Sequence, residues 1–269
     1  DFDQIYGHES QIKALRESIS LGRIPHAQMF VGPEGVGLLP LAIAFMRAVF
    51  CSENNTEVNA CNVKFDRMAH PDVHFVFPVV QTLSQVSDGF LEEWRAQIKE
   101  NLYFDAYSWT KTIDPKERKP IIGGEESGEI IRKLNLKSYE GGYKVLLIWL
   151  AEEMNPTCSN KLLKILEEPP KNTVIFLLSE DPSKLLATIQ SRTQFVRIPK
   201  IESEYLTKEL MSRFQLEKNQ AESIAAFSEG DFIKASHFLN DSDNKGIYRE
   251  HFIQLMRTSY KKDVLGMMQ

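Results

Sequence analysis

The sequence predicts an α/β fold, a doubly wound parallel sheet followed by a small all-helical unit. Short apolar strands alternate with helices over about 200 residues, which is typical of parallel sheets with helices on both faces. A glycine-rich loop follows the first strand directly and opens a helix, as in a βαβ unit. After Pro199 the pattern becomes purely helical. A chain of 269 residues and 30.9 kDa fits two domains better than one.

The first half of the chain contains two predicted strands and several helices. They are a helix at 12–19, a strand at 28–31, the glycine loop at 32–37, a buried helix at 38–50, a strand at 74–80, a surface helix at 91–101 and a helix at 130–136. We expect Asp88 to cap the surface helix. The polar stretch at 105–126, marked by Gly and Pro, is predicted to be a loop.

The second half continues the alternation and then ends in helices. The continuous apolar run at 143–150 predicts a strand covered on both faces. Asn155 and Pro156 predict the start of a helix, and Pro169 its end. The remaining predicted elements are a strand at 173–178, a helix at 182–192, a strand at 194–198 and three helices at 202–214, 218–228 and 232–239.

Composition excludes several classes of protein. With 42% hydrophobic and 26% charged residues the chain is that of a globular protein, and no apolar run reaches the ~18 residues of a membrane span. A net charge of −5 disfavours duplex DNA binding by the chain alone, so any nucleic-acid role is expected to be shared with partners. Three cysteines make a poor disulfide framework and favour free thiols in a reducing cytoplasm. The start Asp1-Phe2-Asp3 lacks a signal peptide and an initiating Met, so we expect a trimmed sequence.

The glycine loop matches a phosphate-binding loop that has lost its charged residues. The template G-x-x-x-x-G-K-[ST] combines a backbone nest, a lysine for the phosphates and a hydroxyl for Mg²⁺. The nest is kept, in Gly32, Gly35, Val36 and Gly37. Leu38 and Leu39 occupy the lysine and hydroxyl positions, and Glu34 adds a negative charge. Residual binding of ADP or sulfate to the loop amides stays open.

The acidic strand end is also missing. In working P-loop NTPases a strand ends in an Asp that helps to hold Mg²⁺, whereas the strand here runs into Trp149 and Leu150. Glu152 and Glu153 come later and are interpreted as a solvated turn. Phosphoryl transfer depends on the groups that these apolar side chains replace, so we expect no hydrolysis and no bound cofactor or metal.

Five segments carry a resemblance to a known family. They are Gly22-Arg23-Ile24-Pro25-His26-Ala27, the glycine loop, Asn160-Lys161-Leu162-Leu163-Lys164, Leu166-Glu167-Glu168-Pro169-Pro170 and Ser191-Arg192. Together they resemble the clamp-loader subunits of bacterial DNA polymerase III, of the delta-prime type with gamma/tau as sister subunits. The resemblance implies an AAA+ P-loop NTPase-like domain at 1–200, a helical lid at 201–245 and the start of a truncated collar at 246–269.

The family also implies a function. Its members form a pentameric ring with gamma/tau and delta subunits, which opens a sliding clamp and loads it at primer–template DNA in the cytoplasm. Delta-prime is the rigid member that need not hydrolyse ATP, which the partner subunits bind, and the ring belongs to a DNA polymerase holoenzyme. In the lid, Ile233 stands where active relatives have an arginine.

The resemblance assigns Ser191-Arg192-Thr193 to the arginine-finger motif. Arg192 would act in trans on the ATP of a neighbouring subunit, where a fixed guanidinium meets developing charge. The structural alternative is that Arg192 only satisfies carbonyl groups at the end of its helix. Spacing alone favours that alternative, and the family match favours the finger.

Other readings are weaker. A zinc site from Cys51, Cys61, His70 and His74 is disfavoured against two free thiols, since His74 falls in a predicted strand. The aromatic residues Phe90, Trp94, Tyr103, Phe104 and Trp109 are predicted to pack in the core and not to stack on bases. Lys161 and Lys164 are predicted to lie on a solvated helix face. The competing functions are an active ATPase using Glu152 or Glu153, and a protein-interaction module outside replication.

Overall fold

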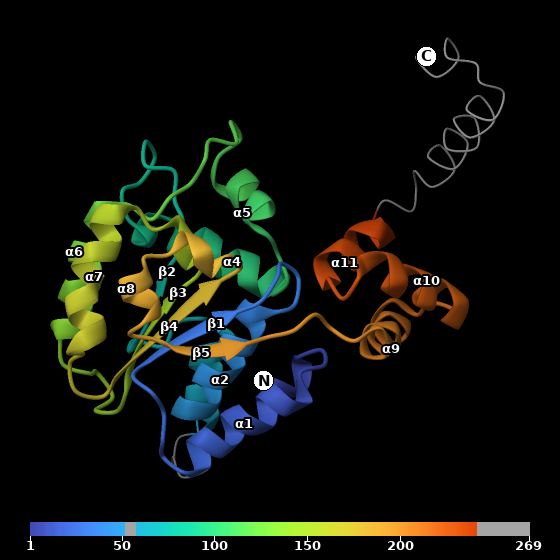
Figure 1. Ribbon diagram of the computed structural model, residues 1–269, viewed down its shortest axis with the longest axis horizontal. Coiled ribbons are helices and arrows are strands. Elements are labelled where there is room, and N and C mark those ends of the chain that lie inside the picture. Colours follow the sequence, from blue (N-terminus) through green and yellow to red (C-terminus); the bar gives the residue numbers. More distant parts are fainter. Residues whose placement is uncertain (52–57, 241–269) are drawn as a thin grey trace.

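The centre of the molecule is a five-stranded parallel sheet (Figure 1). The computed structural model describes residues 1–51 and 58–240. The strands stand in the order β2-β3-β4-β1-β5. Their bounds are Ala27–Val31 (β1), Val73–Val76 (β2), Lys144–Ile148 (β3), Thr173–Ser179 (β4) and Gln194–Arg197 (β5). In the register of the sheet, Met29 of β1 lies between Leu177 of β4 and Phe195 of β5. The predicted parallel sheet is confirmed.

Eight α-helices and four short 3₁₀-helices of the described residues accompany the strands before residue 200. The α-helices are Glu9–Ser20 (α1), Leu38–Phe50 (α2), Val58–Asp66 (α3), Leu91–Glu100 (α4), Ala106–Ile113 (α5), Gly124–Asn135 (α6), Pro156–Glu167 (α7) and Ala187–Gln190 (α8). The 3₁₀-helices are Phe2–Gln4 (η1), Ser87–Phe90 (η2), Ala151–Glu153 (η3) and Pro182–Lys184 (η4).

Each face of the sheet buries its own hydrophobic core. Successive side chains of a strand point to opposite faces, so alternate residues of one strand enter different cores. Phe176 of β4 packs in the core that α2 and α4 cover, whereas its neighbours Ile175 and Leu177 pack in the core beneath α6 and α7. Figure 1 shows α1 and α2 on one side of the sheet and α6 to α8 on the other. This two-sided cover explains why the strands read as continuous apolar runs.

Three further helices follow β5 and share a third core. They are Ser203–Phe214 (α9), Lys218–Ser228 (α10) and Phe232–Asn240 (α11). Leu206, Leu210 and Ile224 are buried among them, and Figure 1 shows the three helices beside the sheet and connected to it by the segment after β5. The collar predicted at 246–269, and residues 241–245 of the predicted lid, lie outside the described residues.

The region at 105–126 is not the loop that was predicted. Asp105 caps α5 by accepting a hydrogen bond from the backbone N–H of Ser108 at 2.6 Å. Trp109 is fully buried, and its indole Nε1 donates to the carbonyl oxygen of Pro78 at 2.8 Å. A buried tryptophan with a satisfied N–H stabilises this short helix in spite of its polar surroundings. In addition, α6 begins at Gly124 and so includes the end of the same stretch.

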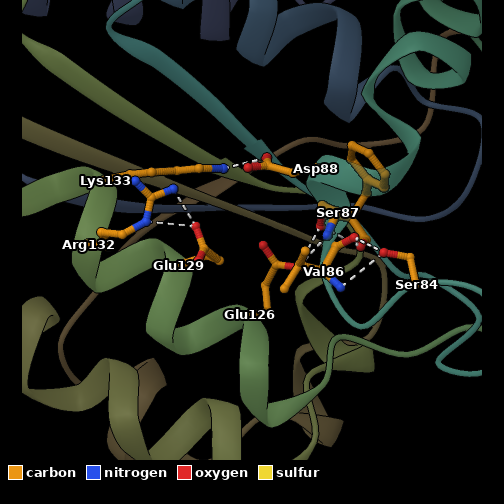
Figure 2. A network of polar contacts seen from close by, with 9 residues as sticks. Ser84, Val86, Ser87, Asp88, Glu126, Glu129, Arg132 and Lys133 are labelled. Carbon is orange, nitrogen blue, oxygen red and sulfur yellow. Dashed lines mark hydrogen bonds and ion pairs between the residues drawn. The ribbon is translucent and has the colours of Figure 1, made fainter.

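A buried polar network holds α6 against the connection between β2 and α4 (Figure 2). Glu126 of α6 accepts hydrogen bonds through Oε2 from the backbone N–H of Ser87 at 2.6 Å and from its hydroxyl at 2.9 Å. Burial raises the pKa of the Glu126 carboxyl. Lys133, which lies further along α6 toward its C-terminus, pairs with Asp88. The prediction that Asp88 caps the surface helix is wrong, because Asp88 lies inside η2 and Phe90 is the N-cap residue of α4.

Cys51 and Cys61 are joined in a disulfide, which links the end of α2 to α3. The prediction of two free thiols is therefore wrong. Their sequence separation of 10 and the packing of α3 against α2 bring the Cα atoms to 5.6 Å, within the range for a disulfide. Cys158 is the buried free cysteine, and burial raises the pKa of its thiol to about 12.

Candidate functional site

The glycine loop lies where the fold of a phosphate-binding protein requires it. It connects the carboxyl end of β1 to the first turn of α2, at the edge of the sheet where ligands of open α/β sheets bind. Gly35 and Gly37 have φ angles of +75° and +90°, which other residues rarely adopt. The loop at Gly32, Gly35, Val36 and Gly37 thus has two glycines in the left-handed conformation, and its chemistry depends on what surrounds it.

Other parts of the chain close this loop. A Cβ atom added to Gly35 would lie 1.7 Å from Oδ1 of Asp231, so the Asp231 carboxylate packs directly on the loop. A Cβ added to Gly37 would lie 2.8 Å from the ring of Tyr103. The carbonyl oxygen of Gly35 accepts a hydrogen bond from the backbone N–H of Phe232 at 3.0 Å. The segment that begins α11 thus covers the loop by direct contact.

Aromatic stacking reinforces this closure. The rings of Tyr6, Tyr103 and Phe232 are mutual neighbours, with centroids 4.8 to 5.1 Å apart. They come from the N-terminal segment, the connection before α5 and the start of α11. Aromatic pairs at such distances contribute about 0.5–1.5 kcal/mol beyond their buried area. The three rings therefore tie the helices after β5 to the sheet beside the loop.

The cavity that remains beside the loop has a volume of about 30 Å³. Pockets for drug-sized or cofactor-sized ligands have ~300–1,000 Å³, so this cavity is much too small for a nucleotide. Its lining includes Leu38 and Leu39 at the lysine and hydroxyl positions, with Trp149, Leu150 and Ile233 around them. Among the described residues that line it there is no lysine or arginine.

Carboxylates gather at the same place. Burial raises the pKa of Glu180, which follows β4 directly, to about 8, and the neighbouring carboxylates of Glu34, Glu152, Asp105 and Asp231 add to this shift. Burial also raises the pKa of Glu34, with Asp105 and Asp231 as further causes. A nucleotide phosphate would meet a surface rich in carboxyl groups here, and no lysine or arginine of the described residues lines the cavity to offset the phosphate charge. The residues present do not fit ATP with magnesium.

The two glutamates after β3 are engaged in structural contacts. Oε1 of Glu152 accepts hydrogen bonds from the backbone N–H groups of Glu180 and Asp181, at 2.9 and 3.3 Å. Glu153 pairs with Lys119 at 3.0 Å. Their interpretation as a solvated turn is wrong, because Glu152 and Glu153 are partly buried in η3 and hold adjoining segments. Trp149 and Leu150 are buried, as an apolar strand end predicts.

Sequence reasoning missed three residues that shape the loop. Tyr103 and Asp231 press against its glycines, and Nε2 of His8 donates a hydrogen bond to the carbonyl oxygen of Val36 at 2.9 Å. Each reaches the loop from a distant part of the chain, so no local spacing could have indicated them. A local signal exists only for Asp231, which follows Gly230 directly before the helix predicted at 232–239.

Arg192 lies far from the loop, at the amino ends of the strands. It comes two residues before β5, and because the strands are parallel it lies at their amino ends, whereas the loop follows the carboxyl end of β1. The four residues of β5 alone span about 13 Å. The guanidinium of Arg192 therefore does not reach the loop of its own chain.

The Arg192 side chain is about one-third exposed and makes contacts within its own chain. Its Nη1 donates to the carbonyl oxygen of Thr188 on α8 at 2.8 Å, so the structural alternative predicted for Arg192 is realised in one contact. Its Nε donates to Oε1 of Glu167 at the end of α7 at 2.7 Å. Ser191 is exposed, and its hydroxyl donates to the same Thr188 carbonyl at 3.2 Å.

The remaining candidates have structural roles. The disulfide engages the sulfur atoms of Cys51 and Cys61, and His70 pairs with Glu140. Among the residues that the structure describes, no group of three His, Cys, Asp or Glu side chains is arranged to hold a metal ion. Lys161 and Lys164 lie on an exposed helix face, as predicted.

The aromatic residues of the first half pack in the interior, which confirms their prediction as core. Trp94 and Trp109 are fully buried with ring centroids 5.2 Å apart, and Trp149 packs on Trp94 at the same distance. Phe104 joins this group, and Phe90 packs against the core from its edge. Of the five predicted residues, four have buried rings that cannot stack on a nucleic-acid base, namely Trp94, Tyr103, Phe104 and Trp109, and Phe90 is partly buried.

The sheet order, the glycine loop between β1 and α2, and the helices after β5 define a P-loop NTPase-like protein of the AAA+ class. Residues 7–202 match the family described as DNA polymerase III, delta subunit, and the chain belongs to that family. The resemblance to clamp-loader subunits predicted from the sequence motifs is confirmed.

Individual relatives agree with this assignment. The chain is 31% identical to DNA polymerase III subunit delta' of Bacillus subtilis (strain 168) over 186 residues, which are 68% of this chain and 45% of that protein. Over 81 residues, 30% of this chain and 24% of the relative, it is 40% identical to subunit delta' of Escherichia coli (strain K12). It is 26% identical to subunit tau of the same organism over 209 residues, 78% of this chain and 27% of the relative. The chain thus spans less than half the length of these relatives.

Solved structures of similar proteins include a gamma subunit-related protein of DNA polymerase III from Thermotoga maritima. It has a TM-score of 0.46 and 18% identity, with 80% of this chain and 58% of that chain covered. The RuvB K64R mutant of the same organism has a TM-score of 0.48 and 14% identity, with 87% of this chain and 61% of that chain covered.

In residues 1–51 and 58–240, no helix combines the length and apolar character needed to cross a membrane.

Proposed function

We propose that this chain is a non-hydrolysing, delta-prime-like subunit of the DNA polymerase III clamp loader. In this proposal it binds no ATP with magnesium, and acts as a rigid scaffold that donates Arg192 to the ATP site of a neighbouring subunit. Its partners are gamma/tau and delta subunits, and through the ring the sliding clamp and primer–template DNA in the cytoplasm. In this proposal the AAA+ domain comprises residues 1–200, and the lid begins at residue 201.

One observation carries the proposal: other residues of the same chain, Asp231, Tyr103 and Phe232, cover the phosphate loop. The cavity beside it has a volume of about 30 Å³, and its lining includes apolar side chains and the Glu180 carboxyl. Phosphoryl transfer relies on cations and metal ions that neutralise developing charge, and the positions that normally supply them hold Leu38, Leu39, Trp149 and Leu150.

Two further features support the scaffold role. The loop, the aromatic rings of Tyr6, Tyr103 and Phe232, and the backbone hydrogen bond from Phe232 to Gly35 connect the sheet to the following helices. These contacts hold the junction in one arrangement without a nucleotide. The position of Arg192 at the amino ends of the strands supports action in trans.

The nucleotide part is tested by titration of the purified chain with ATP, with and without Mg²⁺. We expect neither metal-dependent binding up to about 1 mM ATP nor turnover, because the loop offers no cation to offset the phosphate charge. Residual binding of ADP or sulfate to the loop amides is compatible with the proposal. Metal-dependent hydrolysis that Glu152→Gln abolishes would instead identify an active ATPase.

The arginine part is tested in a ring reconstituted from this chain and the ATP-binding subunits of its family. Arg192→Ala is expected to leave folding and assembly unchanged, because the side chain is partly exposed and its ion pair contributes little stability. At the site that receives the arginine, the rate constant of hydrolysis should fall by about 10³-fold or more. An unchanged rate in quenched-flow measurements of the first turnover would return Arg192 to a structural role. Failure of the wild-type chain to assemble with the ATP-binding subunits would refute its proposed role as a subunit of the ring.

A further inference from the structure

The contacts of Arg192 show how its guanidinium is oriented. One N–H on each of its three nitrogens is engaged: Nε and Nη2 contact Oε1 of Glu167, and Nη1 contacts the carbonyl oxygen of Thr188. A further contact to the hydroxyl of Ser191 is long, at 3.5 Å. Contacts to all three nitrogens fix the orientation of the guanidinium.

Two N–H groups of the guanidinium lie outside the three short contacts. A guanidinium carries five N–H groups in a rigid fork, so the three short contacts leave one N–H on each terminal nitrogen. Two such N–H groups match a pair of phosphate oxygens, as in bidentate pairing of arginine with phosphate. The side chain thus keeps its phosphate-binding donors available while it is held in place.

The end of α7, which carries Glu167, is held in place by a hydrogen bond. It is the last residue of α7, whose preceding residue Leu166 accepts a hydrogen bond through its carbonyl oxygen from Nε2 of His26 at 3.0 Å. His26 lies immediately before β1, so the end of α7 is tied to the amino edge of the sheet. The side chains of Glu167 and Arg192 are 49% and 31% exposed, and solvent screens such a pair strongly. The pair therefore contributes little stability, and its main effect is on orientation.

We propose that Glu167 is a positioning residue, which orients the guanidinium of Arg192 toward a phosphate on the neighbouring subunit. This inference rests on the proposed function, in which Arg192 acts in trans. An arginine that is already ordered loses less side-chain entropy when it meets the phosphate, and small errors in the placement of a catalytic group are costly. Glu167 thereby affects the rate of a reaction whose atoms it never touches.

The test is Glu167→Gln in the complete reconstituted ring, with ATP as the probe. Glutamine keeps the shape of the side chain but not its charge, so the hold on Nε and Nη2 weakens. At the site served by Arg192 the rate constant of the first turnover should fall by roughly 10- to 100-fold. The KM for ATP should stay unchanged, because the neighbouring subunit holds the nucleotide. Glu168→Gln, one residue along and also exposed, is the matched control and should leave both quantities as in the wild type.

A double variant separates the two proposals. Glu167→Gln combined with Arg192→Ala should be no slower than Arg192→Ala alone, since Glu167 acts only through the arginine. If Arg192→Ala slows the site but Glu167→Gln leaves it unchanged or accelerates it, the positioning role is refuted and the proposed function stands. If Arg192→Ala itself has no effect, the proposed function fails and this inference fails with it. Equal slowing by Glu167→Gln in the presence and absence of Arg192 would assign Glu167 a purely structural role and overturn the inference.

Discussion

At the scale of single residues, Glu180 illustrates what the loss of cations does to a phosphate site. Its carboxyl lies beside the glycine loop, where burial first and then neighbouring carboxylates raise its pKa from 4.5 to about 8. In the folded state it therefore keeps its proton over a pH range in which the unfolded chain has lost it. The site is adapted to a neutral acid and not to an ionised one.

This shift predicts a pH dependence of stability. Because the folded state binds more protons than the unfolded state between about pH 4.5 and 8, the contribution of Glu180 to stability is present below pH 4.5 and is lost as pH rises through 8. Glu180→Gln removes the ionisation, so the variant should gain on the wild type with increasing pH, by about 1–2 kcal/mol at pH 9 after solvent screening.

Urea unfolding at pH 5 and pH 9 measures this difference. Taking the variant minus the wild type cancels the other titrating groups, which both proteins share. Glu168→Gln, an exposed neighbour of the α7 end, serves as the control and should show no such trend. A constant difference between Glu180→Gln and the wild type at both pH values would contradict the raised pKa.

Residue identities that follow from a motif could be predicted, and contacts between distant segments could not. Leu38 and Leu39 stand at fixed offsets from the glycines, so their effect on phosphate chemistry could be argued without a structure. Asp231 and Tyr103 reach the loop only because the chain folds back on itself. Their carboxylate and ring close a site that the sequence alone indicated only as degenerate.

At the scale of elements, periodic segments were predicted well and short buried elements were not. The strands β1, β3 and β4 are apolar on both faces, which gives a strong local signal. The helix α5 lies in a polar stretch and depends on the cap from Asp105 and on the buried ring of Trp109. Tertiary packing, not local propensity, determines that helix.

The disulfide between α2 and α3 carries a prediction about stability. Replacing both Cys51 and Cys61 with serine removes a crosslink of sequence separation 10, which should lower the free energy of unfolding by about 2–3 kcal/mol. The physical reason is that the unfolded chain regains the freedom that the closed loop had removed. Urea denaturation without reductant measures the change.

Reductant provides the control for this prediction. Added to the wild type it should give the same loss of stability, and added to the double serine variant it should give no further loss. Alkylation followed by mass spectrometry tests the premise directly: if both thiols react in the folded protein without reductant, the chain has no such crosslink and the original expectation of free thiols is restored.

At the scale of the whole molecule, the parallel sheet followed from the alternation of strands and helices, since parallel strands require crossover connections. The junction between the sheet and the helices after β5 has no counterpart in any local pattern. It is formed by the hydrogen bond from Phe232 to Gly35, by the rings of Tyr6 and Tyr103, and by Asp231 on the loop. Closure of the loop is thus a property of the assembled fold.

Because contacts from distant segments close the loop, we predict that restoring the phosphate-loop motif in the sequence does not restore nucleotide binding. Leu38→Lys combined with Leu39→Thr rebuilds the consensus phosphate loop in sequence, yet Asp231 still packs on Gly35 and Tyr103 on Gly37. The introduced ammonium would lie beside the Glu180 carboxyl, which lines the same cavity of about 30 Å³, and opposite charge favours ionisation of that carboxyl. The new cation is then neutralised by the protein before any phosphate arrives.

We therefore expect the double variant to fold and still to show no binding of ATP with magnesium up to about 1 mM in calorimetric titration. Its stability should fall by roughly 1–3 kcal/mol, because two buried apolar side chains are replaced by polar ones. Circular dichroism and thermal unfolding check that the variant is folded. A dissociation constant in the micromolar range would mean that the two leucines alone keep the nucleotide out, and that the contacts of Asp231, Tyr103 and Phe232 open readily. Continued absence of binding in a folded variant would show that the two leucines are not the sole cause, and that the contacts on the loop, the Glu180 carboxyl and the apolar strand end at Trp149 and Leu150 still exclude the nucleotide.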